Sequence, residues 1–357
     1  MSVVEQIEVG IIGTGWCGGI RAEALHRNPI VGKLHIAEIR TDRLQEMVDW
    51  YSPATATEDY NDLLANPDIS AIFISATPEH LHFPMAKESL EAGKHVFLEK
   101  PIAISLAEAD ELLAISEKNN LKFSIGYSQR FNPKYAYVRE SLLNGSLGEP
   151  VTALHSRHIS RGLGEKISGR TKLSPAAMEA THDLDFVLWC LEPAKPVKVY
   201  AQNSYKYWKD KGSPQIPDCT WIIVTMDSGI CFTIGAGWVL PKSYPNYSST
   251  SMEMIGTNGA LVIDDTHRDV VLHTENDGIQ FPMSTMPGEY VGHVYAGPMA
   301  PETDYFVEAC VFDKPVMVTG EQARKVMEVY IAADMSVERD QPVSLPLNSN
   351  DISSIRV

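Results

Sequence analysis

The sequence predicts an α/β protein with an N-terminal doubly wound parallel sheet and a C-terminal α/β domain built on a large, mostly antiparallel open sheet. Three observations predict this fold. Apolar runs alternate with amphipathic helical patterns over the first 125 residues, a glycine-rich turn follows the first run, and consecutive strand patterns begin near residue 150. Apolar strands separated by helices are typical of a covered parallel sheet, whereas strands joined by tight turns are typical of antiparallel pairing.

The N-terminal part of the chain alternates strand and helix patterns. Helix-like stretches near residues 17–27, 42–50, 80–92 and 105–118 separate five apolar runs. Such alternation predicts βαβ units, and therefore a dinucleotide-binding Rossmann domain over residues 1–127. The five strand-like runs are Ile7–Ile12, Leu34–Ile39, Ala71–Ser75, His95–Leu98 and Lys122–Ile125.

Strand patterns dominate after about residue 150 and are joined by turns such as Asp227–Gly229 and Thr257–Gly259. They predict a second domain with a mostly antiparallel sheet over residues 128–357, which we expect to be the substrate-binding and oligomerisation domain. Helices are expected to cover one face of its sheet, and the open face is expected to join subunits into a homodimer or homotetramer. The strand patterns are Pro150–Ser160, Val197–Tyr205, Thr220–Met226, Ile230–Trp238, Ser251–Ile255, Ala260–Ile263 and Val270–His273, and the helical patterns are 175–191, 301–312 and 320–338.

The composition restricts the classes of function. A formal net charge of −16, from 46 acidic and 30 basic residues, argues against binding to nucleic acid or to an anionic membrane surface. The five cysteines are scattered and form no C-x-x-C pair, which argues against a disulfide framework or a zinc site and fits a reducing cytoplasm. The N-terminal residues show no secretion signal, and no uncharged apolar run reaches the roughly 20 residues that span a bilayer.

A glycine-rich turn follows the first apolar run and fits G-x-G-x-x-G between a strand and a helix. The first glycine permits the tight turn, the second lets the backbone approach a pyrophosphate, and the third allows close packing of the helix on the sheet. The helix N-terminus then offers free N–H donors to the phosphates. The residues expected to bind a dinucleotide here are Gly13, Gly15, Trp16, Cys17 and Gly18.

Two charged residues after the second apolar run bear on the choice of cofactor. Glu38 lies where a carboxylate would bond the adenosine ribose hydroxyls and repel a 2′-phosphate. Arg40 is the opposing signal, because a guanidinium at this place can hold that phosphate. Together they predict NAD as the cofactor and leave NADP open.

The third apolar run is followed by Thr77, Pro78 and His82. Ligands of an open α/β sheet lie beyond the carboxyl ends of its strands, so these three residues are expected to contact the cofactor. The alternative is that Pro78 only starts a helix and that His82 caps it or faces solvent.

The fourth apolar run ends in Glu99-Lys100-Pro101. An ammonium group at the carboxyl end of a parallel strand can bond a substrate hydroxyl and stabilise developing alkoxide charge. Lys100 is therefore a candidate catalytic residue, with Glu99 expected either to pair with it or to fix the loop. The alternative for any single lysine is a solvated surface charge.

A helical pattern in the second domain carries a histidine flanked by acids. Ser174 and Pro175 are a good helix start, and His182 and Asp185 share a face because they are three residues apart. Such a histidine is a candidate general base, since its charge changes near neutral pH and a carboxylate can set its tautomer. The alternative is a histidine that is ion-paired within its own helix.

The motifs together resemble the Gfo/Idh/MocA oxidoreductases, a family that includes inositol 2-dehydrogenase and glucose–fructose oxidoreductase. The glycine loop alone is unspecific, whereas the combination of the later motifs is specific, and the resemblance covers nearly the whole chain. It rests on Gly13–Gly18, Thr77-Pro78 with His82, Glu99-Lys100-Pro101, Gln129-Arg130-Phe131-Asn132-Pro133, His182-Asp-Leu-Asp185 and Gly256–Gly259.

The resemblance implies that Lys100 and His182 are catalytic, and that Gln129 and Glu99 lie with the cofactor-binding residues. It also implies that His182 accepts the alcohol proton while Lys100 orients the hydroxyl. In one place the sequence departs from the family, which usually has an aspartate where this chain has Met178. We expect Glu179 to take that role; the alternatives are that Asp185 alone orients His182, or that the substrate differs from the usual polyol of the family.

The expected activity is hydride transfer between nicotinamide and a secondary alcohol or ketone of a sugar, cyclitol or related hydroxylated ring. Arg157 and Trp238 are expected substrate contacts, with Trp238 stacking on a ring face. A trans-dihydrodiol dehydrogenase is the alternative enzyme, and a non-catalytic, dinucleotide-sensing regulator is the alternative of another class. No metal is expected.

Overall fold

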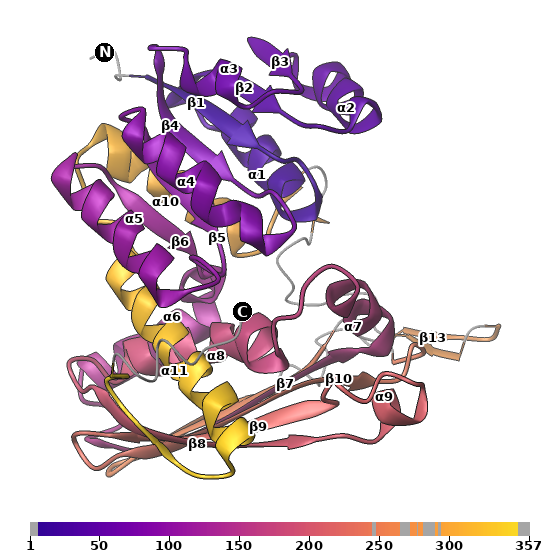
Figure 1. Cartoon of the computed structure of the whole chain (residues 1–357), viewed down its shortest axis with the longest axis vertical. Helices are drawn as coiled ribbons and strands as arrows, with labels where there is room; N and C mark the ends of the chain where they lie inside the picture. The colour runs from indigo at the N-terminus through magenta and orange to yellow at the C-terminus, as the bar shows by residue number, and fades with distance from the viewer. Residues whose placement is uncertain are drawn as a thin grey trace. The chain divides into compact units, whose positions relative to one another are not determined.

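The structure is a computed structural model that describes residues 6–244, 248–264, 272–276, 278–280, 290–291 and 294–348. The chain divides into two compact units. The first comprises Met1–Phe131 and Tyr290–Arg324, and the second comprises Asn132–Glu289 and Lys325–Val357. Figure 1 shows the elements with the labels used below.

The first unit contains a six-stranded sheet in the order β3-β2-β1-β4-β5-β6, in which every neighbouring pair is parallel. The prediction of a doubly wound sheet is confirmed. The winding direction reverses at β1, and ligands of such sheets bind at the carboxyl edge beside the reversal. The strands are β1 (Ile7–Ile12), β2 (Val31–Ala37), β3 (Thr55–Thr57), β4 (Ile69–Ile74), β5 (His95–Glu99) and β6 (Phe123–Gly126). The helices between them are α1 (Trp16–Arg27), α2 (Thr41–Tyr51), α3 (Asn61–Leu64), η1 (Glu79–Leu81), α4 (His82–Glu91) and α5 (Leu106–Lys118), followed by η2 (Ser128–Phe131).

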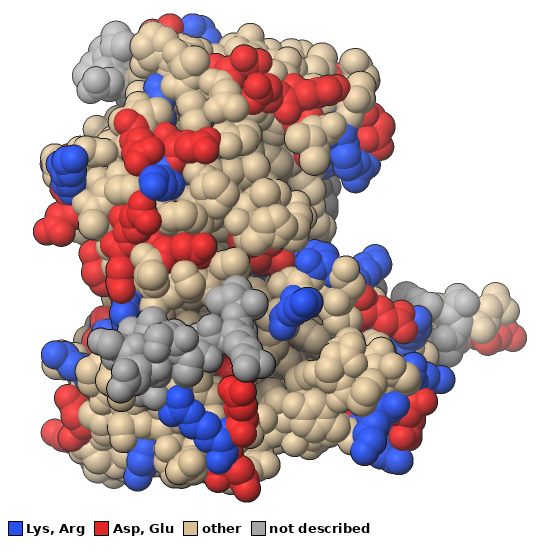
Figure 2. All heavy atoms as spheres, viewed as in Figure 1, with Lys and Arg blue, Asp and Glu red and all other residues tan. Residues whose placement is uncertain are grey.

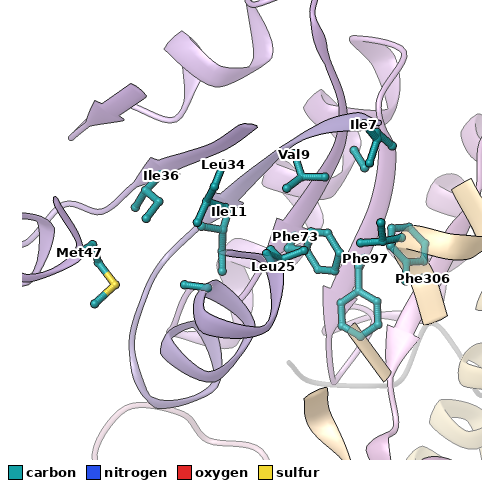
Figure 3. Packing of buried hydrophobic residues seen from close by; sticks show 13 residues of the cluster. Ile7, Val9, Ile11, Leu25, Leu34, Ile36, Met47, Phe73, Phe97 and Phe306 are labelled. Atoms are coloured by element: carbon teal, nitrogen blue, oxygen red, sulfur yellow. The ribbon is translucent and has the colours of Figure 1, made fainter. Parts of the chain in front are cut away.

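Helix α10 (Met299–Val311) packs in the core of the first unit, although it follows the second sheet in the chain. Phe306 meets Phe73 and Phe97 edge to face, with ring centroids 5.4 and 5.5 Å apart (Figure 3). Such pairs contribute about 0.5–1.5 kcal/mol each beyond their burial. The sequence placed this helix in a continuous second domain from residue 128, and the structure differs because its apolar side completes the first core.

The second unit contains a seven-stranded sheet in the order β12-β11-β7-β10-β9-β8-β17. Only the β7–β10 pair is parallel among its described pairs, so the prediction of a mostly antiparallel sheet is confirmed. The predicted strand Val270–His273 lies partly outside the described residues. The strands are β7 (Pro150–Ser160), β8 (Pro196–Ser204), β9 (Cys219–Met226), β10 (Cys231–Leu240), β11 (Ser248–Gly256), β12 (Ala260–Asp264) and β17 (Val343–Ser344). Two short hairpins, β13 (Leu272–Thr274) with β14 (Gly278–Gln280) and β15 (Tyr290–Val291) with β16 (Val294–Tyr295), stand apart from both sheets.

The second sheet has one buried face and one exposed face, because alternate residues along its strands are buried. Along β9 the buried residues Thr220, Ile222 and Val224 alternate with exposed or half-exposed ones. This alternation is the pattern of a sheet covered on one face. The helices are α6 (Pro133–Leu143), α7 (Arg161–Ser168), the π-helical η3 (Ala176–Ala180), α8 (Thr181–Cys190), α9 (Tyr207–Asp210) and α11 (Gly320–Arg339), the last beginning within the residues of the first unit.

Two features are absent from the described residues. No helix among them is long and apolar enough to cross a membrane, and no group of three or more His, Cys, Asp or Glu residues among them is placed to hold a metal ion. On the face drawn in Figure 2, acidic and basic side chains are interspersed.

Candidate active site

The glycine loop has the geometry of a phosphate cradle. Gly13 has φ +81°, and a Cβ there would lie 2.9 Å from the Ala76 backbone. A Cβ at Gly18 would lie 2.0 Å from the carbonyl oxygen of Gly13, so the backbone of α1 packs directly on the backbone of the loop and leaves no room for a side chain. Gly15, in contrast, has nothing within 4 Å of its Cβ position. The loop is therefore closed on the protein side and open where a pyrophosphate would approach.

The Glu38 carboxylate is fixed beside this loop. It is buried, and its Oε2 accepts hydrogen bonds from the backbone N–H (2.7 Å) and hydroxyl (2.9 Å) of Thr14. Its Oε1 accepts from the N–H of Arg40. The exposed guanidinium of Arg40 instead pairs with Asp42 at 2.7 Å, and this hydrogen bond lowers the pKa of Asp42. A fixed carboxylate next to an already paired arginine fits the ribose hydroxyls of NAD better than the 2′-phosphate of NADP.

Glu38→Ala is expected to weaken NAD binding by roughly 10–100-fold, because hydrogen bonds to a charged group are worth about 1.5–3 kcal/mol. NADP binding should weaken less, since the repelling charge is removed as well. Titrating both cofactors by the quenching of protein fluorescence measures this. Asp49→Ala on the exposed face of α2 is the control, and unchanged NAD affinity in Glu38→Ala would refute the ribose role.

Two residues inside the loop were predicted to bind the cofactor through unspecified groups. Trp16 is 56% exposed at the first turn of α1, so its indole is accessible to a ligand. Burial, with Glu99 adding to the effect, raises the pKa of the Cys17 thiol to about 12. Cys17 is therefore protonated at neutral pH and offers its backbone N–H, not a thiolate.

The buried polar atoms of the first unit that have no hydrogen-bond partner among the described residues include one hydroxyl and one amide oxygen. They are the hydroxyl of Ser75, after β4, and the Oε1 of Gln129, in η2. A buried acceptor without a donor costs about 1–3 kcal/mol, which a bound ligand would recover. Together with the open cradle at Gly15, these atoms fit a bound dinucleotide.

Three residues after β4 were predicted to contact the cofactor, and the structure leaves two of them accessible and buries the third. Thr77 is exposed and Pro78 is half-buried, so both are accessible. The His82 ring is buried, with 1% of the residue exposed, and both its nitrogens face backbone carbonyls. The predicted direct contact of His82 with the cofactor is therefore not supported by the structure, because no face of the ring is accessible.

Lys100 follows β5 and is half-buried. The preceding residue, Glu99, accepts two hydrogen bonds from Arg21 of α1, at 2.9 Å from Nε and 2.6 Å from Nη2. Arg21 is buried and also bonds Glu302 and Thr303 of α10, each at 2.8 Å. Of the two predicted roles for Glu99, the structure shows an ion pair with Arg21 that fixes the loop. Arg21 was missed because its partners are remote in the sequence.

The helix that carries His182 begins with a π-helical turn, Ala176–Ala180, before α8. His182 is half-buried, whereas Asp185 is fully buried and Glu179 is 7% exposed. The relative orientation of Glu179 and His182 does not follow α-helical spacing, because Glu179 lies in the π turn and His182 in the α-helix. π turns are frequent at functional sites, so the π turn before α8 marks this segment as a candidate part of the active site.

Trp238 lies in a hydrophobic cluster and not in a substrate wall. It is 1% exposed and packs with Met178, Trp208, Ile159 and Ile167. A Cβ at Gly164 of α7 would lie 2.6 Å from that of Trp238, so this helix closes over the indole. The prediction that Trp238 stacks on a sugar is wrong, because the ring has no accessible face. Met178 is part of the same core.

Arg157 forms a buried ion pair with the neighbour of His182. Its Nε and Nη2 donate to the Asp183 carboxylate at 3.0 and 2.6 Å, and His155 Nε2 lies 3.3 Å from the same group. Burial, the largest single effect, lowers the pKa of Arg157, but the charge of Asp183 and its hydrogen bonds, with smaller contributions from Tyr135 and Glu179, together outweigh burial and leave the pKa raised. Arg157 therefore ties β7 to α8, and the predicted contact with substrate is not supported by its burial.

The fold and the site define a class of protein, the dinucleotide-dependent oxidoreductases with a Rossmann domain. A family model described as an oxidoreductase family with an NAD-binding Rossmann fold matches residues 7–127, and the model of the GFO/IDH/MocA C-terminal domain matches residues 135–262. The chain therefore belongs to the GFO/IDH/MocA family, as its motifs predict, and NAD is its cofactor.

Several relatives match over nearly their whole length. The chain is 27% identical to the uncharacterized oxidoreductase YrbE of Bacillus subtilis, covering 96% of this chain and 98% of the relative. It is 24% identical to the myo-inositol 2-dehydrogenase of Thermotoga maritima, covering 95% and 98%. Among solved structures, scyllo-inositol dehydrogenase of Lactobacillus casei with bound NAD(H) and scyllo-inositol has a TM-score of 0.82 at 22% identity, covering 95% of this chain and 99% of that one.

Proposed function

We propose that the chain transfers hydride between NAD and a secondary alcohol or ketone of a cyclitol, sugar or related hydroxylated ring. The observation that carries the proposal is the place of Lys100 at the carboxyl end of β5, the edge of the parallel sheet that also carries the glycine loop and Glu38. Relatives named as inositol dehydrogenases support the class of substrate.

The proposed roles follow from the chemistry of the side chains. NAD, when bound, supplies the hydride acceptor for oxidation of the alcohol. The ammonium group of Lys100 bonds the reacting hydroxyl and stabilises the negative charge that develops on its oxygen. The imidazole of His182 accepts the hydroxyl proton, and the buried carboxylates of Asp185 and Glu179 favour the charged ring that results.

A substrate panel tests the activity directly. Cyclitols, aldoses, uronic acids and nucleotide sugars would be incubated with NAD and with NADP, and nicotinamide absorbance would be followed. Turnover is expected with at least one cyclitol or sugar, and with NAD in preference to NADP. Binding of NAD without turnover of any class would contradict the proposal and favour the dinucleotide-sensing regulator.

The role of Glu179 is supported by its burial in the turn that leads into His182, and by the apolar cluster around Met178, where a carboxylate would be costly. Glu179→Gln is expected to lower kcat about tenfold. It should also move the acidic limb of the kcat profile to lower pH, because a lost carboxylate favours the charged imidazole less. An unchanged kcat and pH profile would assign the orientation of His182 to Asp185 alone.

The open face of the second sheet supports self-association. By the strand register, its outward residues include exposed apolar side chains at 37–64% exposure. Exposed apolar side chains spread over neighbouring strands of one face are typical of an interface, and sedimentation analysis would show a dimer or tetramer. The patch consists of Leu154, Trp221, Ile223, Ile255 and Val262.

A further inference from the structure

The segment that carries Lys100 is fixed on both sides by buried side chains of other elements. On one side Glu99 is held by Arg21 of α1. On the other, the carbonyl oxygen of Pro101 lies 2.7 Å from His82 Nδ1, at the first residue of α4. The backbone of Lys100 thus has a fixed neighbour before it and another after it, while its own side chain is only half-buried.

His82 joins this segment to the loop that follows β4. Its Nε2 lies 3.0 Å from the carbonyl oxygen of Ala76, next to the exposed Thr77. Burial lowers the pKa of His82, and a neutral ring donates from one nitrogen only. Donation from Nδ1 to Pro101, the shorter of the two contacts, leaves Nε2 beside the Ala76 carbonyl, so one buried imidazole lies between the carboxyl ends of two adjacent strands, β4 and β5. A ring with both nitrogens on backbone carbonyls has no group left for substrate or cofactor, so any effect it has on chemistry must pass through the two loops.

The Arg21 tie is equally buried and is geometrically specific. The guanidinium engages the carboxylates of Glu99 and Glu302 and lies 4.1 Å from the centroid of the Phe97 ring. A Cβ at Gly126 would lie 3.0 Å from Glu99 Oε2, so β6 also leaves room for the carboxylate and little more. A planar fork of donors suits two carboxylates in a way that a lysine cannot.

We propose that Arg21 and His82 are positioning residues that set the place of the Lys100 ammonium group by fixing Glu99 and Pro101. This inference rests on the proposed catalytic role of Lys100. Misplacing a reacting group by about 1 Å can cost 100-fold in rate, so loss of one tie should act on kcat more than on cofactor binding.

The two amide side chains provide a matched test at His82. Glutamine places its amide where Nε2 stood, beside Ala76, and loses the hydrogen bond to Pro101, whereas asparagine places its amide where Nδ1 stood and can donate to Pro101. His82→Gln is expected to lower kcat roughly 30–100-fold with NAD affinity within about threefold of wild type. The kcat of His82→Asn is expected to be at least about fivefold higher than that of His82→Gln.

A buried histidine elsewhere in the same sheet controls for stability. His35 of β2 is 3% exposed, and its nitrogens lie 3.0 Å from Thr55 Oγ1 and 3.1 Å from Glu8 Oε2. His35→Gln should lower the melting temperature by a similar amount and leave kcat unchanged when rates are divided by the NAD-binding fraction. A kcat loss in His35→Gln equal to that in His82→Gln would overturn the proposal, as would equal kcat values in the two His82 variants.

Arg21→Lys tests the second tie while keeping a charge between Glu99 and Glu302. It is expected to lower kcat about tenfold and to shift the pH profile of kcat, because the fork that fixes Glu99 is lost. A variant that loses stability without either change would show that Arg21 is only structural. If Lys100→Met retains turnover, the proposed function fails; if Lys100→Met abolishes it and these variants behave like their controls, only the positioning role fails.

Discussion

Lys100→Met is expected to lower kcat by at least about 1,000-fold while NAD affinity stays within about threefold of wild type. The substitution keeps the length of the side chain and removes the only group that could bond the hydroxyl from this position. Losing a donor that stabilises a developing oxyanion costs about 100–1,000-fold, and losing help with proton transfer costs about 100–10,000-fold. Glu38 and the glycine loop, which are proposed to hold the cofactor, are untouched.

Steady-state rates with the best substrate of the panel, together with fluorescence titration of NAD, measure the two effects separately. Lys87→Met is the control, because Lys87 lies on α4 and pairs with Glu111 at the surface. A Lys100→Met enzyme that turns over normally would remove the catalytic role. Loss of NAD binding in proportion to kcat would make Lys100 a cofactor ligand instead.

The first sheet was predictable because its strands are local, near-continuous apolar runs. β1 and β4 appear within a residue or two of their predicted bounds, since the last four residues of each are buried and none of them is polar. β3 (Thr55–Thr57) was missed, because a strand of three residues, none of them buried, carries no period that a sequence pattern can show. The place of α10 was missed because an apolar helix face does not specify the core on which it packs.

The candidate site was predictable only where a short motif carries its own chemistry. The glycine loop, Glu38 and Lys100 are each recognisable from their position directly after a strand, namely β1, β2 and β5. Arg21 and Asp183 were not, because their roles depend on contacts with partners such as Glu302 and Arg157 that are distant in sequence. The misplacement of Trp238 has the same origin, since an aromatic residue in a strand is as well suited to a core as to a ligand wall.

Arg157→Met tests whether Arg157, predicted from the sequence to contact substrate, is instead structural. It is expected to lower the free energy of unfolding by about 3–5 kcal/mol. Removing one partner of a buried ion pair leaves the other charge without compensation. Asp183 is fully buried, and after the substitution the His155 imidazole, at 3.3 Å, would remain beside it without the charge of Arg157. Urea unfolding, followed by tryptophan fluorescence, measures the loss.

The double variant Arg157→Met with Asp183→Asn separates the charge from the packing. Because it removes both charges, it should recover much of the stability lost in Arg157→Met, a non-additivity that a simple packing defect would not produce. Below the unfolding transition, the KM for substrate should match wild type in Arg157→Met. An Arg157→Met enzyme that has full stability and a raised KM would instead support the substrate contact predicted from the sequence. The same pair of measurements therefore decides whether β7 presents Arg157 to a ligand or uses it to hold the helix that carries His182.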